Sequence, residues 1–293
     1  MQTLSLAFLV FAPAQTPEII DKVETSLYVL RLQDKETGAF KVTPDGKPSL
    51  RACNGAVKGL SYLGRKESVP NVEKVKAFVL SCYDPKTGAF AEPGGKPDVA
   101  ITSIGIMVAC ELGIPKEKFA KGLEYLKANA KSFEEIRIGA AALESLEAKP
   151  DWLKNWFKLA DAQLINENGT AGEVDSVSRD TASVLAIRLR LVGSLTDFKN
   201  GKALIELIRN GQWKDGGFGR HGAEKSDLES TYRVMRLMML TKSKPLHPDS
   251  LRKFLSTCKN ADGGFGVAPG EQSTMSGAYY FAAISKWLEE AAK

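Results

Sequence analysis

The chain has 293 residues, and its hydrophobic fraction of 43% and charged fraction of 26% are ordinary for a soluble globular protein. The formal net charge of +5 is spread over 40 basic and 35 acidic residues. Because the Lys and Arg residues form no dense run and are not interleaved with aromatic residues, nucleic acid is not an expected partner.

The first residues allow two interpretations. Residues 4–12 form an apolar stretch that is too short to span a bilayer, so no transmembrane segment is expected there. Small residues at Ala12 and Ala14 are typical of a cleaved secretory signal over residues 1–14, although no Lys or Arg precedes the apolar stretch. The alternative is an apolar lead-in to the first helix. A signal predicts an exported, periplasmic or secreted protein, and without one the protein is expected in the cytoplasm.

From residue 15 onward, apolar positions recur with a helical period and predict pairs of helices joined by loops. Asp98 is well suited to cap the N-terminus of one of them. The third pair lacks a glycine-aromatic turn between its helices. The expected pairs are 18–32 with 50–63, 72–82 with 98–112, 116–128 with 134–146, 151–165 with 176–191, 201–211 with 227–240, and 247–258 with 274–288.

A turn rich in glycine and aromatic residues recurs within these pairs. Phe40 and Phe90 are 50 residues apart, and Phe218 and Phe265 are 47 apart, which indicates one supersecondary unit used several times. Glycine supplies positive φ angles there, and burial of each Phe is expected to contribute roughly 2–3 kcal/mol. The turns read T-G-A-F at 37–40 and 87–90, and D-G-G-F-G at 215–219 and 262–266.

Six helical hairpins without a convincing strand predict an all-α fold. A straight solenoid would leave two end units that need polar caps. Because the first and last units are as apolar as the others, we expect a closed ring of six inner and six outer helices. The prediction is an (α/α)6 toroid forming a single domain over residues 15–293.

The turns and helix starts resemble the prenyltransferase and squalene-oxidase repeats of the terpenoid toroids. The resemblance is greatest to the β-subunits of protein prenyltransferases, in particular the type II geranylgeranyl enzyme, and it covers nearly the whole chain after Gln15. It implies a central cavity that holds an isoprenoid or an apolar peptide. It also implies outer helices that contact a protein partner.

In those β-subunits a catalytic zinc is held by an Asp, by a Cys two residues later and by a His of the final repeat. The resemblance places Asp227, Glu229 and Gly277 at these three positions. Catalytic zinc usually has three protein ligands and one open position, and Gly277 supplies none. The departure counts against zinc-dependent transfer. The alternative is that Asp227 caps a helix, with Glu229 in its first turn.

The family's diphosphate clamp is an Arg and a Lys in the loop before that Asp. The aligned positions here are His221 and Glu224, flanked by Arg220 and Lys225, so a shift of the loop by one residue restores two cations. Arg220 is the better candidate because guanidinium binds phosphate in a bidentate manner. A solvated surface loop is the alternative.

Three further residues are candidates for the cavity. In the family a G-E-V-D stretch, matched here at 172–175, precedes an Arg that faces the cavity. Arg179 is the local equivalent, displaced by two residues, and a solvent-facing Arg179 is the alternative. Tyr232 and Tyr279 are candidate lining residues, with packing in the core as their alternative.

Two other chemistries found on toroids lack their motifs. Triterpene cyclases protonate an alkene with the middle acid of D-x-D-D-T, but residues 178–181 read S-R-D-T and place Arg179 at the acid. The thioester motif G-C-G-E-Q is interrupted by Pro269. The sequence therefore leaves two functions open: a prenyltransferase-like toroid, or a non-catalytic exported toroid that binds a ligand or a protein.

Overall fold

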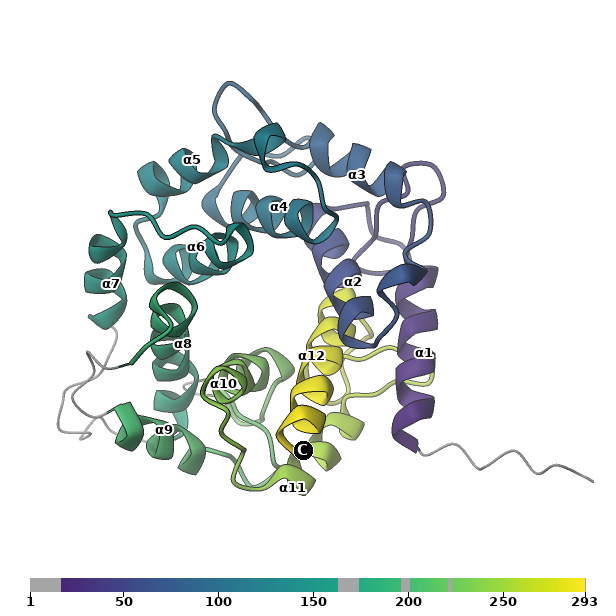
Figure 1. Ribbon diagram of the computed structural model, residues 1–293. Coiled ribbons are helices and arrows are strands. Elements are labelled where there is room, and N and C mark those ends of the chain that lie inside the picture. The colour runs from purple at the N-terminus through teal and green to yellow at the C-terminus, as the bar shows by residue number, and fades with distance from the viewer. Residues whose placement is uncertain (1–16, 163–173, 196–200, 221–222, 293) are drawn as a thin grey trace, which may run out of the picture.

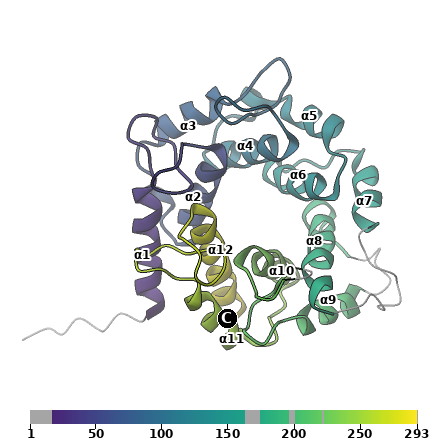
Figure 2. The same ribbon diagram turned by 180° about the vertical axis from the view of Figure 1, so that it is seen from behind.

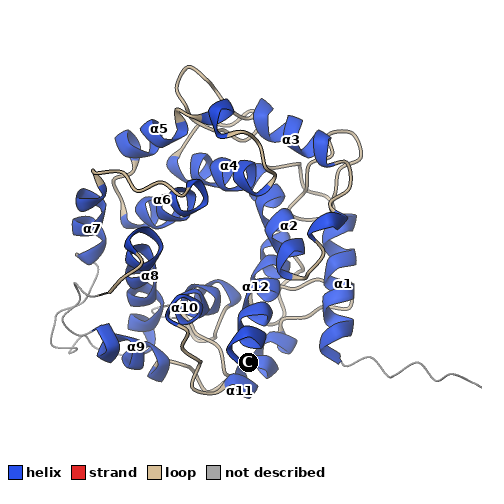
Figure 3. Cartoon of the chain, viewed as in Figure 1, coloured by secondary structure: helices blue, strands red, loops and turns tan. Residues whose placement is uncertain are grey.

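The computed structural model describes residues 17–162, 174–195, 201–220 and 223–292. Within these ranges the protein forms twelve α-helices, two short 3₁₀ helices and isolated bridges, but no β-strand (Figure 3). None of the described helices is both long and apolar enough to cross a membrane. The expectation of a signal over residues 1–14 and the turn at 167–172 lie outside the described residues.

The helices alternate between an inner and an outer ring (Figures 1 and 2). The inner helices are α2 Leu50–Tyr62, α4 Val99–Glu111, α6 Phe133–Leu146, α8 Val174–Val192, α10 Leu228–Thr241 and α12 Met275–Ala292. The outer helices are α1 Pro17–Arg31, α3 Val72–Ser81, α5 Gly122–Asn129, α7 Leu153–Asp161, α9 Gly201–Asn210 and α11 Pro248–Thr257. The 3₁₀ helices are η1 Lys66–Ser68 and η2 Lys116–Phe119.

The ring is closed by contact between the last and the first hairpin. Each inner helix packs against the inner helices before and after it, and α12 packs against both α10 and α2. The Met275 N–H donates to the Val42 carbonyl at 2.8 Å, and Lys259 lies 2.7 Å from the Glu24 carboxylate. The predicted all-α toroid of helical hairpins is therefore confirmed.

The repeated turns hold each hairpin against the next. The aromatic residues of the four turns, Phe40, Phe90, Phe218 and Phe265, are all fully buried, as predicted. Gly88 has a φ of +79°, and a Cβ added there would lie 2.5 Å from the Lys121 carbonyl oxygen, just before α5. Gly263 is similarly placed, since its added Cβ would lie 3.1 Å from the backbone oxygen of Glu24 in α1. The last turn thus packs on the first helix.

The third hairpin differs from the expectation in one respect. The helix predicted over 116–128 is divided into η2 and α5, with a break at Lys121, where the backbone meets Gly88. The helix that follows, α6, begins with a capping box, in which Ser132 and Glu135 each accept a backbone N–H of the other. Side-chain caps also start α2, α4 and α10, so the inner helix of the third hairpin begins like the others although its glycine-aromatic turn is missing.

Replacing Gly88 by Ala tests the close packing between hairpins. Gly64 is a matched control, because its φ of +72° is similar but an added Cβ would meet nothing within 4 Å. We expect Gly64→Ala to lower the free energy of unfolding by about 1–2 kcal/mol, the cost of a left-handed backbone. Gly88→Ala should cost roughly 3 kcal/mol or more, because the Lys121 backbone must also move. Urea denaturation measures both, and equal costs would contradict the packing.

Candidate functional site

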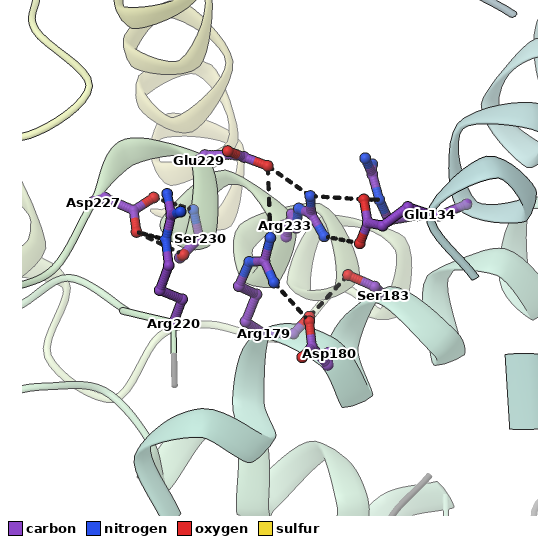
Figure 4. Close-up of polar contacts among 10 residues, drawn as sticks. Glu134, Arg179, Asp180, Ser183, Arg220, Asp227, Glu229, Ser230 and Arg233 are labelled. Carbon is purple, nitrogen blue, oxygen red and sulfur yellow. Dashed lines mark hydrogen bonds and ion pairs between the residues drawn. The ribbon is translucent and has the colours of Figure 1, made fainter. Parts of the chain in front are cut away.

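Asp227 caps the N-terminus of α10. Its Oδ1 accepts the Ser230 N–H at 2.7 Å, and its Oδ2 accepts the Ser230 hydroxyl at 2.8 Å (Figure 4). The Nε of Arg220 lies 3.5 Å from the same Oδ2. Both carboxylate oxygens of Asp227 are therefore engaged in holding the start of the helix, which agrees with the N-cap interpretation.

Glu229 lies in the first turn of α10 and is paired with two arginines. Its Oε1 accepts a hydrogen bond from Arg233 at 2.6 Å and lies 3.7 Å from Nη2 of Arg179. Arg233 also donates to both oxygens of Glu134 in α6, at 2.7 and 3.0 Å (Figure 4). Burial alone would raise the pKa of Glu229, but the charge and hydrogen bond of Arg233, together with the charges of Arg179 and Arg137, lower it. The carboxylate is thus held ionised.

Arg179 lies on α8 and reaches the first turn of α10. Its Nη1 donates to Asp180 at 2.9 Å, and its side chain is largely buried beside Glu229. The loop cations lie elsewhere: Arg220 is exposed apart from its contact with Asp227, and Lys225 is exposed. The predicted residue His221 lies outside the described residues. The structure therefore brings Arg179 and Glu229 together, while Arg220 joins Asp227 at the end of α10.

These residues do not fit a zinc site. The oxygens of Asp227 cap α10, and Glu229 is held by Arg233 and Arg179. At Gly277 an added Cβ would lie 2.0 Å from the Phe265 carbonyl oxygen, so this backbone admits no ligand side chain. Within the described ranges, no three His, Cys, Asp or Glu side chains gather as a metal would require.

Aromatic side chains from α2, α10 and α12 form one group, which we call the aromatic cluster. The hydroxyls of Tyr232 and Tyr279 lie 2.7 Å apart, and the ring centroids of Tyr232 and Trp287 are 5.2 Å apart. The two tyrosines predicted for the cavity are thus brought together. The cluster comprises Tyr62, Tyr232, Tyr279, Tyr280 and Trp287.

A second feature, the arginine recess, lies between α6, α8 and α10. Its cavity volume is only about 20 Å³, and it is partly open to solvent. Two carboxylates pair with its four arginines: Glu134 with those at 137 and 233, and Glu144 with those at 190 and 236. The lining residues are Arg137, Ser183, Ala186, Ile187, Arg190, Tyr232, Arg233 and Arg236.

Tyr232 belongs to both the aromatic cluster and the arginine recess, and its chemistry reflects this position. Burial alone would raise the pKa of its phenol, but the charges of Arg236 and Arg190 outweigh burial and lower the pKa. Burial raises the pKa of Tyr62 to about 12, although the charges of Arg236 and Arg190 act on this phenol too. The arginines of the recess thus act on more than one tyrosine of the cluster.

Sequence reasoning missed the four arginines of the recess and three members of the aromatic cluster. Two local signals were present. Arg233 follows Glu229 by four residues, a spacing that places an ion pair on one helix face. Trp287 follows Tyr280 by seven residues, two helical turns, and so shares its face. The sequence of a single helix does not show that Arg137 and Arg190 come to lie beside Arg233 and Arg236.

The comparisons with known proteins agree with this fold. A model of the prenyltransferase alpha-alpha toroid domain matches residues 1–135 and 136–289. The chain therefore belongs to the prenyltransferase alpha-alpha toroid family, and the resemblance drawn from the sequence is confirmed at that level.

Among curated proteins, the geranylgeranyl transferase type-1 subunit beta of Arabidopsis thaliana is 32% identical over 123 residues. The match covers 41% of this chain and only 32% of that subunit. The resemblance drawn from the sequence was greatest to the type II enzyme, whereas this relative belongs to the type 1 enzyme. The two findings therefore agree on the family and differ on the type of enzyme.

Among solved structures, the type II terpene cyclase MstE from Scytonema has a TM-score of 0.64 at 10% identity, covering 94% of this chain and 98% of that one. A variant of the same cyclase in complex with geranylgeranyl dihydroxybenzoate gives 0.64 at 11% identity, with 95% and 99% covered. An alpha-amylase from Clostridium perfringens gives 0.60 at 12% identity, with 95% and 99% covered. At these identities the likeness shows the fold alone.

The ion pairs of Glu134 predict a pH dependence of stability. Burial alone would raise the pKa of Glu134, but the hydrogen bond from Arg233 and the charge of Arg137 bring it from 4.5 down to about 2. Because the folded pKa lies below the unfolded one, this contribution is present above about pH 4.5 and is lost as the pH falls toward about 2.

Glu134→Gln should therefore reduce the loss of unfolding free energy between pH 5 and pH 2, measured by urea denaturation at a series of pH values. The effect is expected to be modest, because Glu134 is half exposed. Glu206→Gln, which breaks an exposed pair with Arg209 on α9, is the matched control. An unchanged pH slope in Glu134→Gln would contradict this account of the network.

Proposed function

We propose that the protein binds an isoprenoid-type ligand at the centre of the toroid, with the apolar chain against the aromatic cluster. The observation that supports this proposal is the juxtaposition of five aromatic side chains with a polar recess on the inner helices. Ligand sites are typically concave, with apolar and aromatic walls and a few convergent polar groups that orient the ligand.

Similar proteins support the choice of ligand. The curated relative is a subunit of a geranylgeranyl transferase, and a cyclase of the same fold was solved with a geranylgeranyl compound. The alternative of an apolar peptide ligand has less support, because a continuous peptide backbone needs hydrogen-bonding partners that the aromatic cluster offers only at its hydroxyls.

The proposed function is ligand binding. It does not include zinc-dependent thiol alkylation or alkene protonation, two reactions known for toroids. Zinc-dependent thiol alkylation is not included, because Asp227, Glu229 and Gly277 do not fit a zinc site. Alkene protonation needs a neutral carboxylic acid, whereas arginines hold the pKa of Glu134 and Glu229 below its usual value. These two carboxylates therefore cannot serve as strong proton donors near neutral pH.

A role as a protein-interaction toroid is not favoured. The large apolar residues exposed within the described part of the chain are scattered over four helices and one loop, which is normal for a protein surface. They are Leu27, Val72, Leu159, Val192 and Leu246. A protein partner on the outer helices, and export directed by residues 1–14, both stay predictions.

Titration calorimetry with farnesol tests the proposal. We expect farnesol to bind the folded protein, and Tyr279→Ala to weaken binding by about tenfold, because one aromatic wall and the hydroxyl that positions Tyr232 are lost. Tyr83→Ala is the control, since Tyr83 packs on Phe90 near the outer helices. A folded protein that takes up no farnesol, or equal losses in both variants, would contradict the proposal.

A further inference from the structure

One lysine of the inner ring has no charged partner. Lys58 lies in α2, one helical turn before Tyr62 of the aromatic cluster, and is half-buried. Within the part of the chain that the structure describes, its ammonium group makes no hydrogen bond and no ion pair. Glu111, whose charge acts on Lys58, lies 3.0 Å from Lys66 instead. The amine of Lys58 is therefore not held by a carboxylate.

This amine is directed towards the arginine recess. Three of the side chains that line the recess act on the charge of Lys58, although they belong to α8 and α10 rather than to α2. In all, the titratable and charged groups that face Lys58 are Tyr232, Arg190, Arg236, Glu111 and Cys110.

The cations at this place outnumber the carboxylates. Arg190 and Arg236 are only 9% and 13% exposed, and both pair with one oxygen of Glu144, at 3.6 and 3.3 Å. With Lys58, three cations share a single carboxylate, which leaves two positive charges uncompensated among the described residues. Taking charges out of water is unfavourable unless counter-charges and hydrogen bonds compensate them.

Hydrogen-bond donors are also left unused there. The Nε atoms of Arg190 and Arg236 are buried and donate to no acceptor within the described ranges. Buried donors are normally satisfied, so each unsatisfied one needs a reason. The recess has a cavity volume of about 20 Å³, and by this measure one water molecule needs roughly 10–15 Å³. An acceptor that meets these donors must therefore consist of only a few atoms.

The surroundings of Lys58 favour its neutral, nucleophilic form. Burial lowers the pKa of this amine, and the charges of Arg236 and Arg190 add to the effect, while Tyr232 and Glu111 oppose it only in part. A lysine that is desolvated beside other cations is an activated nucleophile, because more of it is unprotonated at a given pH.

We propose that Lys58 is a carbamylation site, at which the amine takes up carbon dioxide and Arg190 and Arg236 hold the resulting carbamate. The lone pair of Nζ attacks the carbon of CO2, an N–C bond forms, and one C=O π pair moves onto oxygen. The ammonium group gives up two protons to solvent in all, so one cation becomes one anion and no oxidant or reductant is needed. The charges of Lys58, Arg190, Arg236 and Glu144 then balance.

The carbamate also accounts for the two unused donors. Its oxygens are acceptors for the Nε groups of Arg190 and Arg236, and hydrogen bonds between ionised groups are the stronger kind. The added group has three heavy atoms, which suits a small recess that is partly open to solvent. This inference does not depend on the proposed isoprenoid ligand.

Chemical trapping on the whole protein tests the inference. The protein is incubated with ¹³C-labelled bicarbonate at pH 8, treated with triethyloxonium tetrafluoroborate to convert carbamates to stable esters, and digested for mass spectrometry. Lys76 is the matched control, since it is also half-buried but pairs with Glu73 at 2.8 Å. We expect the labelled ester at Lys58 to exceed that at Lys76 by at least tenfold. No ester at Lys58, or equal amounts at both lysines, would overturn the inference.

A pair of variants tests whether the place of Lys58 favours an anion. Lys58→Glu and Lys58→Gln have nearly the same size and differ in charge. In CO2-free buffer at pH 8, thermal unfolding should show Lys58→Glu to be the more stable, because Arg190 and Arg236 face the new carboxylate. The control pair should show the opposite order, because Lys76→Glu places a carboxylate beside Glu73. A Lys58→Glu variant less stable than Lys58→Gln would contradict the inference.

The response of stability to CO2 is the third readout. A ligand that binds only the folded state raises the melting temperature. We expect bicarbonate, compared with chloride at equal pH and ionic strength, to raise the melting temperature of the unaltered protein. It should not raise that of Lys58→Arg, because a guanidinium stays protonated and cannot form a carbamate. Equal responses of the two proteins would contradict carbamylation of Lys58.

Discussion

The close approach of backbone at the turn glycines is the constraint on which the rest of the structure depends. At Gly88 and Gly263 the chain takes a positive φ and lies against the outer helix of the next hairpin. In the last hairpin that next helix is α1, so the same contact that stacks two neighbours also closes the ring. Closure leaves no terminal unit to cap, and it fixes which faces of the inner helices point at one another.

The inner faces then divide into an apolar and a charged part. The aromatic cluster comes from α2, α10 and α12, and the arginine recess from α6, α8 and α10, so α10 contributes to both. The carboxylates at Glu134 and Glu229 stay ionised because arginines surround them, which removes them as acids and makes them part of the scaffold of the recess. The family fold thus carries an interior with an aromatic part and a charged part.

Much of the fold was predictable from the sequence, because the regular spacing of the glycine-aromatic turns shows that one helical hairpin is repeated along the chain. The caps at Asp98 and Asp227 and the burial of the turn aromatics followed from single residues and their neighbours. The division of the third hairpin was not predicted, since it arises where Lys121 meets a glycine of another repeat.

The candidate site was predictable only in part, for a physical reason. The family resemblance suggested Arg179, and the expectation of an aromatic cavity lining suggested Tyr232 and Tyr279. Helical periodicity shows which residues share one face. It does not show how far each helix is rotated in the ring, and that rotation brings Arg137 and Arg190 from two helices to face Arg236 on a third. The family resemblance identified Asp227 and Glu229 at the zinc positions. It did not show that Glu229 forms an ion pair with Arg233, and this pair decides the chemistry of Glu229.

The central proposal is that an isoprenoid-type ligand lies inside this ring. A crystal structure of the protein with farnesol tests it most directly. We expect the chain of farnesol to lie in van der Waals contact with Tyr232 and Tyr279. Farnesol bound on the outer helices, with none inside the ring, would contradict the proposal.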